Sequence, residues 1–197
     1  MRATEHAPRD PFRVLERRHG LAEIVERGPV VHVERYRVDD ILALQHNLAN
    51  MYARLGRDEQ ALCMRQKIYS ETLKLLGKEH ENTLQTATSY AISLLKSQRY
   101  AEAMTLLRNM TSVARRALGE NHELTLKMRK MYAASLCVNP DATLDDTREA
   151  IKTLEEIQPI ARRVLGGAHP LTKRIEGGLR ESRAVLRFRE ASSKTTN

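Results

Sequence analysis

Apolar residues recur at helical spacing along most of the chain. From residue 83 to about residue 96 they stand three or four positions apart, beginning with Leu84, Ala87 and Ala91. A second run of this kind follows from residue 100 to residue 118, after a short polar stretch. Such spacing puts the apolar side chains on one face of an α-helix. The pattern therefore predicts helices that pack in successive pairs through their apolar faces.

The linkers between these helix pairs repeat one phrase. It reads LGKEHENTL at 76–84, LGENHELTL at 118–126 and LGGAHPLTK at 165–173. The first two copies lie 42 residues apart and the last two lie 47 apart, so the third unit carries five additional residues. The change of spacing falls after Ala133, which places the insertion at the turn near Asn139-Pro140-Asp141. A turn accepts an insertion because a longer loop costs little extra closure entropy.

The register of this phrase sets the expected domain organisation. We predict an all-α, right-handed helical-repeat solenoid of antiparallel helix pairs over residues 39–189. The pairs are expected at about 39–77, 83–119 and 125–166, followed by a closing helix at 172–189. Thr83 can cap the first helix of its pair. Gly119 is expected to end the second helix as a left-handed C-terminal cap.

Both ends of the chain fall outside the register. Residues 1–38 include a stretch, Arg13–Arg27, that could form an amphipathic helix and cap the open end of the array. The sequence leaves open whether residues 1–38 are a cap, a targeting segment or a disordered segment. The polar residues 190–197 are expected to form a disordered tail.

Composition narrows the class of protein further. The chain is 41% hydrophobic and only 4% aromatic, which suits closely stacked helices better than a sheet. The formal net charge of +8 favours acidic partners, whether peptide, nucleic acid or anionic membrane surface. Cys63 and Cys137 lie in apolar helical stretches and are interpreted as reduced core thiols of a cytoplasmic protein. No apolar run approaches the ~20 residues of a membrane-spanning helix.

The first predicted pair carries a distinctive phrase, HNLANMYARLGRDEQAL, from His46 to Leu62, and the Leu-Gly-x-x-His-x-x-Thr linker follows it. In this phrase and in repeat length the chain resembles the tetratricopeptide repeats of the kinesin light chain type, over about residues 39–186. The heptad repeats that would join a motor chain are not found in this sequence, so the resemblance is to the repeat module only. It implies a non-catalytic scaffold for protein–protein interaction that holds an extended peptide in a groove lined by the first helices. The family position that often bonds a ligand's backbone is Asn47 here, with Ser89 and Met131 as its register partners.

Polar and basic side chains on the predicted first helices are the candidate peptide-binding residues. They are Asn47, Asn50, Arg54, Gln85, Thr88, Lys96, Lys127 and Lys130, with Arg174 in the same register. Cations in a groove bind carboxylates through charge-assisted hydrogen bonds, so the expected ligand is an acidic or mixed peptide. For any single residue of this set, a solvated helix face is the simpler explanation. His46 fits a groove residue and a plain surface histidine equally well.

Other functions find less support in the sequence. The basic surface leaves nucleic-acid or polyanion binding as the alternative, although aromatic stacking positions and nucleic-acid motifs are missing. No metal or cofactor is expected, because His80, His122 and His169 stand one per linker and are expected to bond across their own turns. The sequence holds no phosphate-binding glycine loop, no nucleophile in a known catalytic context and no HExxH motif, so no enzymatic activity is expected. Self-association through the apolar ends of the solenoid is a further expectation.

Overall fold

The computed structural model describes residues 31–195, with side chains from Asp40 to Ala191. The helix predicted at 13–27 therefore lies outside the described residues. The described residues divide into two units at residues 42 and 43. The repeats are described below within the second unit.

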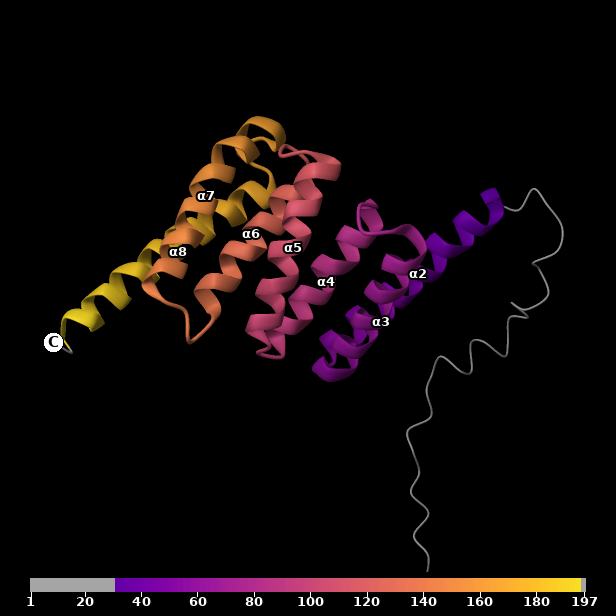
Figure 1. The fold of residues 1–197 in the computed structure, drawn as a ribbon, viewed down its shortest axis with the longest axis horizontal. Helices are drawn as coiled ribbons and strands as arrows, with labels where there is room; N and C mark the ends of the chain where they lie inside the picture. Colours follow the sequence, from indigo (N-terminus) through magenta and orange to yellow (C-terminus); the bar gives the residue numbers. More distant parts are fainter. Residues whose placement is uncertain (1–30, 196–197) are drawn as a thin grey trace, which may run out of the picture. The chain divides into compact units, whose positions relative to one another are not determined.

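Every regular element in residues 31–195 is an α-helix. The helices are α2 (Val31–Arg54), α3 (Asp58–Leu76), α4 (Glu81–Lys96), α5 (Tyr100–Leu118), α6 (Glu123–Val138), α7 (Leu144–Leu165) and α8 (Pro170–Thr195) (Figure 1). This result confirms the all-α helical-repeat class. None of these described helices combines the length and the apolar character needed to cross a membrane.

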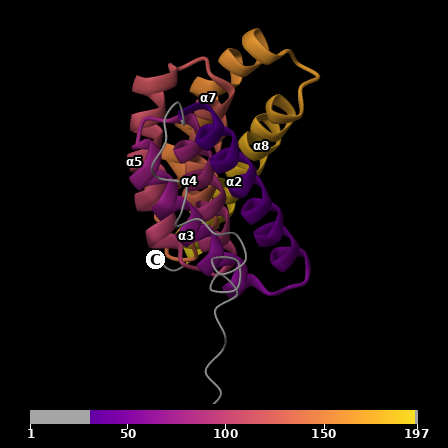
Figure 2. The same ribbon diagram turned by 90° about the vertical axis from the view of Figure 1, so that its right-hand side faces the viewer.

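The helices from α3 to α8 form two layers. Each packs against the next one in the chain, and α7 and α8 lie side by side in both ribbon views (Figures 1 and 2). The first helices of the pairs, α4, α6 and α8, also contact one another in succession. The second helices α3, α5 and α7 make no such contacts among their described residues. A surface that runs along several repeats is therefore built from the first helices.

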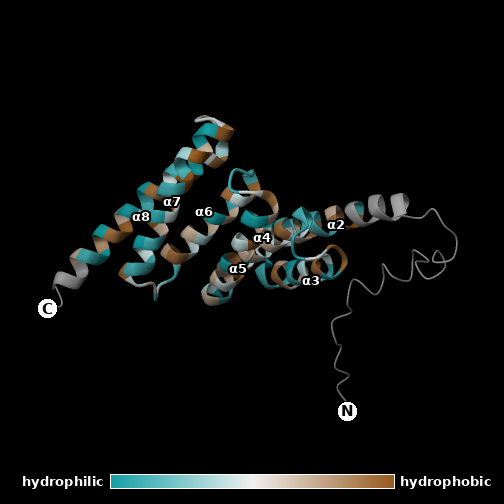
Figure 3. Ribbon diagram, turned by 45° about the horizontal axis from the view of Figure 1, so that its top comes forward, coloured by the Kyte–Doolittle hydropathy of each residue, from teal (hydrophilic) through white to brown (hydrophobic). Residues whose placement is uncertain are grey.

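Small residues allow the helices to approach closely. Ala49, Ala91 and Ala133 stand 42 residues apart and are fully buried. The largest buried cluster extends from Ala91 to Leu179 and joins α4, α5, α6, α7 and α8. Apolar and polar residues alternate around the helices that surround it (Figure 3). The core is thus continuous from the second repeat to the closing helix.

The linker histidines cap the first helices. His80 stands at the N-cap of α4, where its ring Nδ1 accepts a hydrogen bond from the backbone N–H of Asn82 at 3.2 Å. His122 and His169 accept from the backbone two residues ahead in the same way, at 3.2 and 3.3 Å. The prediction that these histidines bond across their turns is confirmed.

The linker threonines tie one repeat to the next. Thr83 lies inside α4, which begins at Glu81, so Thr83 is not the N-cap that the sequence predicted. It is fully buried, and its hydroxyl donates to the carbonyl oxygen of Thr72 in α3 at 3.4 Å. Thr125 and Thr172 donate to the carbonyl eleven positions earlier, at 3.3 and 3.4 Å. The prediction failed because the helix starts two residues earlier and a histidine occupies the cap.

The glycines that end the second helices have an unusual backbone conformation. Gly77, Gly119 and Gly166 have φ of 79°, 89° and 89° and ψ of 169°, 165° and 155°. A left-handed helical cap has ψ near about +47°, so the cap predicted for Gly119 was wrong in type. The observed combination of positive φ and extended ψ is essentially restricted to glycine. This restriction explains why each linker contains a glycine at this position.

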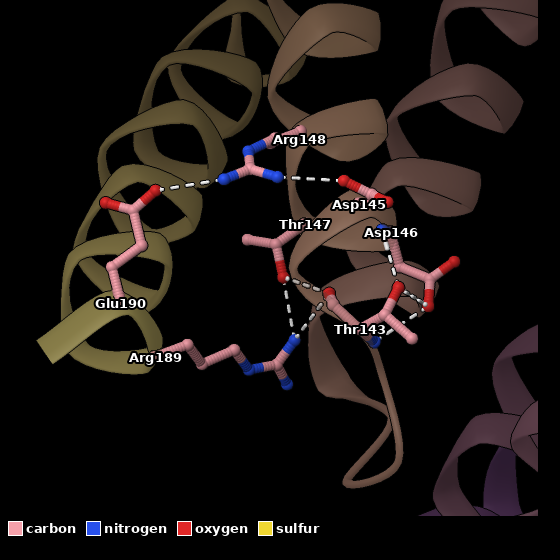
Figure 4. A network of polar contacts seen from close by, with 7 residues as sticks. All are labelled: Thr143, Asp145, Asp146, Thr147, Arg148, Arg189 and Glu190. Carbon is pink, nitrogen blue, oxygen red and sulfur yellow. Dashed lines mark hydrogen bonds and ion pairs between the residues drawn. The ribbon is translucent and has the colours of Figure 1, made fainter. Parts of the chain in front are cut away.

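The five additional residues of the third repeat lie in the loop between α6 and α7 and in α7 itself. The loop 139–143 is two residues longer than the corresponding loop 97–99, and α7 has 22 residues against 19 in α5. The longer helix starts with a capping box, in which Thr143 Oγ1 accepts from the Asp146 backbone N–H at 3.1 Å (Figure 4). The Asp146 carboxylate accepts from the Thr143 backbone N–H at 2.8 Å, and this bond, with that of the Thr143 hydroxyl, lowers the pKa of Asp146. The insertion is therefore fixed by its own hydrogen bonds.

Helix α8 continues to Thr195, past the end predicted at residue 189. The Arg189 guanidinium donates to Thr147 Oγ1 at 2.7 Å and to three backbone carbonyl oxygens in and around the 139–143 loop. Arg148 adds an ion pair to Glu190 at 3.3 Å (Figure 4). These contacts anchor the last turns of α8. The predicted disordered tail 190–197 is helical as far as Thr195, and the last two residues lie outside the described part.

A glycine inside α8 gives a first prediction. We expect Gly178→Ala to stabilise the protein by roughly 0.5–1 kcal/mol, because glycine costs about that much inside a helix. A methyl group at this position would meet Leu154 Cδ1 at 3.8 Å and Lys130 Cε at 3.9 Å, which are ordinary contacts. Urea unfolding followed by circular dichroism measures the change. Ala184→Gly on the same helix is the reverse control and should destabilise by a similar amount; a loss of stability in Gly178→Ala would contradict the packing described here.

Candidate functional site

Four of the predicted ligand-binding residues line one hollow. Asn47, Asn50, Arg54 and Lys96 are exposed, and they surround it together with the buried Arg65. Met51 and Ala53 complete the lining. We call this site the first-repeat hollow, because its residues come from α2, α3 and the end of α4. Two of its basic residues, Arg54 and Lys96, are 42 positions apart and hence occupy the same place in successive first helices.

Arg65 forms the floor of the first-repeat hollow. Its guanidinium donates to Ser93 Oγ and to Asn50 Oδ1, each at 2.7 Å, and more weakly to the Ser89 carbonyl oxygen at 3.5 Å. Burial lowers the pKa of Arg65, and the charge of Asp58 opposes this change in part. The side chain of an α3 residue thus reaches between α2 and α4 to the first-helix side.

His46 stands next to this group. The Ser89 hydroxyl donates to the Gln85 carbonyl oxygen at 3.2 Å, so the ring Nε2–H of His46 donates to Ser89 Oγ at 2.9 Å. Burial lowers the pKa of His46, and the charges of Arg65 and Lys127 lower it further. The bond to Ser89 joins α2 to α4, so His46 is more than a plain surface histidine.

A second hollow lies between α6, α7 and α8. Lys130 lines it, with Cys137 and Val138 from the same helix, Leu154 from α7, and Gly178, Glu181, Ser182 and Val185 from α8. Burial lowers the pKa of Lys130, while the charge of Glu181 raises it and that of Arg174 lowers it. We call this site the third-repeat hollow. Its lining is mostly apolar apart from the Lys130 and Glu181 end and Ser182.

The remaining predicted residues differ in accessibility. Gln85 is exposed on α4, and Lys127 is half-buried on α6, where its charge reaches His46. Thr88 is 1% exposed, and its hydroxyl donates to the Leu84 carbonyl oxygen at 2.8 Å. In this structure Thr88 offers no group to a ligand, whereas the other seven residues have accessible surface.

The residues that the sequence did not single out are Arg65, Ser89 as a partner of His46, and Ser93. A signal for Arg65 was present in the register. Positions 65, 107 and 154 correspond in the three second helices, and they hold Arg, Leu and Leu. The other two repeats bury a leucine at this position. The arginine at position 65 is therefore not explained by packing of the core.

Comparison with known proteins identifies the repeats. Residues 40–109 match the family model described as tetratricopeptide repeat. Over these residues the chain is similar to tetratricopeptide repeats. Its repeat fold is similar to the crystal structure of a putative kinesin light chain with nearly identical TPR-like repeats from Podosopora anserina, with 22% identity, 78% of this chain and 70% of that chain covered, and a TM-score of 0.60. BtubC (BKLC) from P. vanneervenii is similar over 79% of this chain and 66% of its own, with 11% identity and a TM-score of 0.50.

These structural likenesses bear on the fold alone. The two structures share a helical-repeat fold with this chain. A search of curated proteins gave no significant match. The two hollows are therefore interpreted from their own residues.

The hollows occupy the same place in the first and third repeats. Arg65 of the first corresponds to Leu154 of the third, and Lys96 corresponds to Val185. Asn50 corresponds in turn to Ala134, which also lines its hollow. The same position in the repeat therefore forms a hollow in the first and in the third repeat. The first-repeat hollow has a polar and basic lining, and the third-repeat hollow has a more apolar one.

The environment of His46 predicts a pH effect on stability. Since folding lowers the pKa of His46, its neutral ring contributes stability that is fully present above the unfolded value of about 6.5 and is lost as the pH falls through the folded value. We expect the wild-type protein to lose more stability between neutral and mildly acidic pH than the His46→Gln variant, whose amide can still donate to Ser89. Parallel thermal melts across this range measure the difference, and an NMR titration reports the ring directly. Equal losses in the two proteins would contradict this environment.

Proposed function

We propose that the first helices of these repeats bind a peptide segment of a partner protein, with an acidic or mixed sequence, and that the protein is a non-catalytic scaffold. Tetratricopeptide repeats generally mediate protein–protein interaction, and solenoids present extended surfaces for this purpose. The observation that carries the proposal is the pair of hollows at one position of the repeat, lined by Asn47, Asn50, Arg54 and Lys96 in one case and Lys130 in the other.

Charge supports an acidic ligand. The lining of the first-repeat hollow includes three basic side chains and no carboxylate among its described residues. Elsewhere many arginines already pair with acids, for example Arg116 with Glu79 and Arg183 with Glu155. Arg54 and Lys96, in contrast, make no ion pair with a described residue and lie together at the first-repeat hollow, which favours a bound acidic segment there.

A peptide array probed with the purified protein tests the proposal. Lys127→Glu and Lys130→Glu should each weaken binding of the captured acidic peptides by about tenfold or more, since a charge-assisted hydrogen bond is replaced by repulsion. Lys152→Glu on α7 makes the same change of charge on a second helix and should leave binding unchanged. Circular dichroism of each variant checks its folding. Unchanged affinity for every captured peptide in both α6 variants would remove the groove assignment.

The same proteins separate the polyanion alternative. A nucleic-acid or polyanion binder would bind heparin at physiological salt, and its affinity would fall steeply as salt rises. We expect weak retention that Lys152→Glu lowers as much as Lys127→Glu does. Strong retention together with an empty peptide array would favour the alternative.

Two further features belong to the proposal. Both cysteines are free, and Cys63 is exposed, so it is not the core thiol that the sequence predicted. An exposed free thiol supports a cytoplasmic location, because such thiols persist in reducing compartments. Self-association is supported by the exposed apolar residues Leu44, Met51 and Leu55 on and just after α2. Light scattering over a range of protein concentrations tests self-association, and a constant mass of one chain would remove it.

A further inference from the structure

We propose that the first-repeat hollow is a phosphate site, in which Arg65, Arg54 and Lys96 bind a phosphorylated side chain of the peptide ligand. The inference rests on the proposed function for the source of the phosphate. It goes beyond that function by naming the group that one hollow takes.

The first observation is a buried charge without an ionic partner. Arg65 and Arg129 are each 7% exposed. Arg129 pairs with Glu120 at 3.2 Å and with Glu156 at 2.5 Å. Arg65 donates only to neutral oxygens, and no carboxylate of a described residue lies within ion-pair distance. A buried cation of this kind carries a desolvation cost, which the charge of Asp58 offsets only in part. An anion in the hollow would offset it further.

The second observation is that packing does not require the charge. The corresponding residues in the other two repeats are Leu107 and Leu154, and both are buried in the core. Leucine therefore fits this position of the repeat. Replacing a buried ion by a well-packed apolar residue is often neutral or stabilising. An arginine here is explained by binding better than by stability.

The third observation concerns the donors that face the hollow. A guanidinium has donors only, so the bond from Arg65 to Asn50 fixes the Asn50 oxygen toward Arg65. The amide NH₂ of this exposed residue is then directed away from Arg65 and is free to donate to an anion. Arg54 and Lys96 are both exposed and line the same hollow. Arg54 and Lys96 thus place two exposed cations beside the Asn50 amide, whose orientation is fixed by Arg65.

The number of charges favours phosphate over carboxylate. Three cations line the hollow and none of its lining residues is acidic. A carboxylate would offset one of these charges, whereas a phosphate monoester carries roughly −1.5 to −2 at neutral pH and presents three acceptor oxygens. The third-repeat hollow provides a contrast, because Glu181 lies in its lining and its charge acts on Lys130. The phosphate site is therefore assigned to the first-repeat hollow alone.

The test uses the full chain and three defined probes: inorganic phosphate, N-acetyl phosphoserine amide and N-acetyl glutamate amide. Calorimetric or NMR titration should show saturable binding of both phosphate probes and much weaker binding of the glutamate probe. Arg65→Leu should weaken phosphate binding by about tenfold or more, because the charge is lost. Lys96→Gln should weaken it too, and Lys152→Gln should not. Bound phosphate should also raise the pKa of His46, which adjoins Arg65.

Folding and binding can be separated in this design. Arg65→Leu is expected to unfold at the same or a higher urea concentration, since it restores the leucine of the other repeats. Phosphate binding that Arg65→Leu leaves unchanged would overturn the site, and glutamate binding as tight as phosphate would overturn the choice of anion. On an array of paired serine and phosphoserine peptides, equal capture of both forms would overturn the peptide as the source of the phosphate. Failure of the proposed function would give a different result. Lys127→Glu and Lys130→Glu would then leave the binding of unphosphorylated acidic peptides unchanged.

Discussion

Leu107→Ala is expected to destabilise the protein by roughly 2–5 kcal/mol, the range for truncating a fully buried leucine. Leu107 is 0% exposed and belongs to the cluster that joins α4 to α8. Its loss removes apolar contacts and leaves a cavity that stiff neighbouring helices fill only in part. Urea unfolding monitored by circular dichroism measures the change.

The control for this experiment is Leu75→Ala. Leu75 is 66% exposed near the end of α3, so its truncation should change stability by no more than about 0.5 kcal/mol. A similar cost for the two variants would mean that the core is not where the structure places it. The comparison with Arg65→Leu is also informative, because positions 65 and 107 correspond in the repeat. One substitution should cost several kcal/mol and the other little or nothing.

Gly119→Ala is expected to cost about 1–3 kcal/mol through backbone strain alone. Gly119 has φ 89° and ψ 165°, and nothing lies within 4 Å of the place where a Cβ would stand. The cost therefore comes from the dihedral angles and not from a clash. Gly167→Ala in the next linker is the matched control: it has equal open space and no positive φ, so its stability should be nearly unchanged. If both variants unfold at the wild-type urea concentration, the linker conformation described here is wrong.

The repeat architecture could be predicted from the sequence because its signal is written three times. The spacing of Gly, His and Thr fixes the register, and the helices follow from it. The roles inside the linker could not be predicted as easily. Serine, threonine and aspartate are the usual N-caps, so the sequence favours Thr83 as the N-cap of this helix. In the structure the N-cap is His80. Likewise a glycine after a helix indicates a positive φ. The sequence does not give the ψ angle, which distinguishes a left-handed helical cap from the extended conformation observed at Gly119.

The site was predictable in part for a related reason. Exposed polar positions on the first helices can be predicted from helical periodicity. Seven of the eight predicted peptide-binding residues have accessible surface in the structure. Thr88 is the exception and is buried. A threonine hydroxyl can be buried because it can donate to the backbone of its own helix, as the Thr88 hydroxyl does to the Leu84 carbonyl oxygen. Arg65 was overlooked because it sits on a second helix. Its path to the first-helix side depends on how far its long side chain reaches between α2 and α4.

The bond from each linker threonine to the preceding helix has a consequence for how such a chain can grow. Thr83, Thr125 and Thr172 each reach back eleven residues, so every junction is complete within one helix, the linker after it and the first turn of the next helix. A copied segment of 42 residues would carry both halves of its own junction. Gene duplication could then lengthen the array without a change at any interface, and the residues that line the surface of each new copy would be free to diverge. The arginine at position 65 and the leucine at position 154 are two outcomes of such divergence at one site.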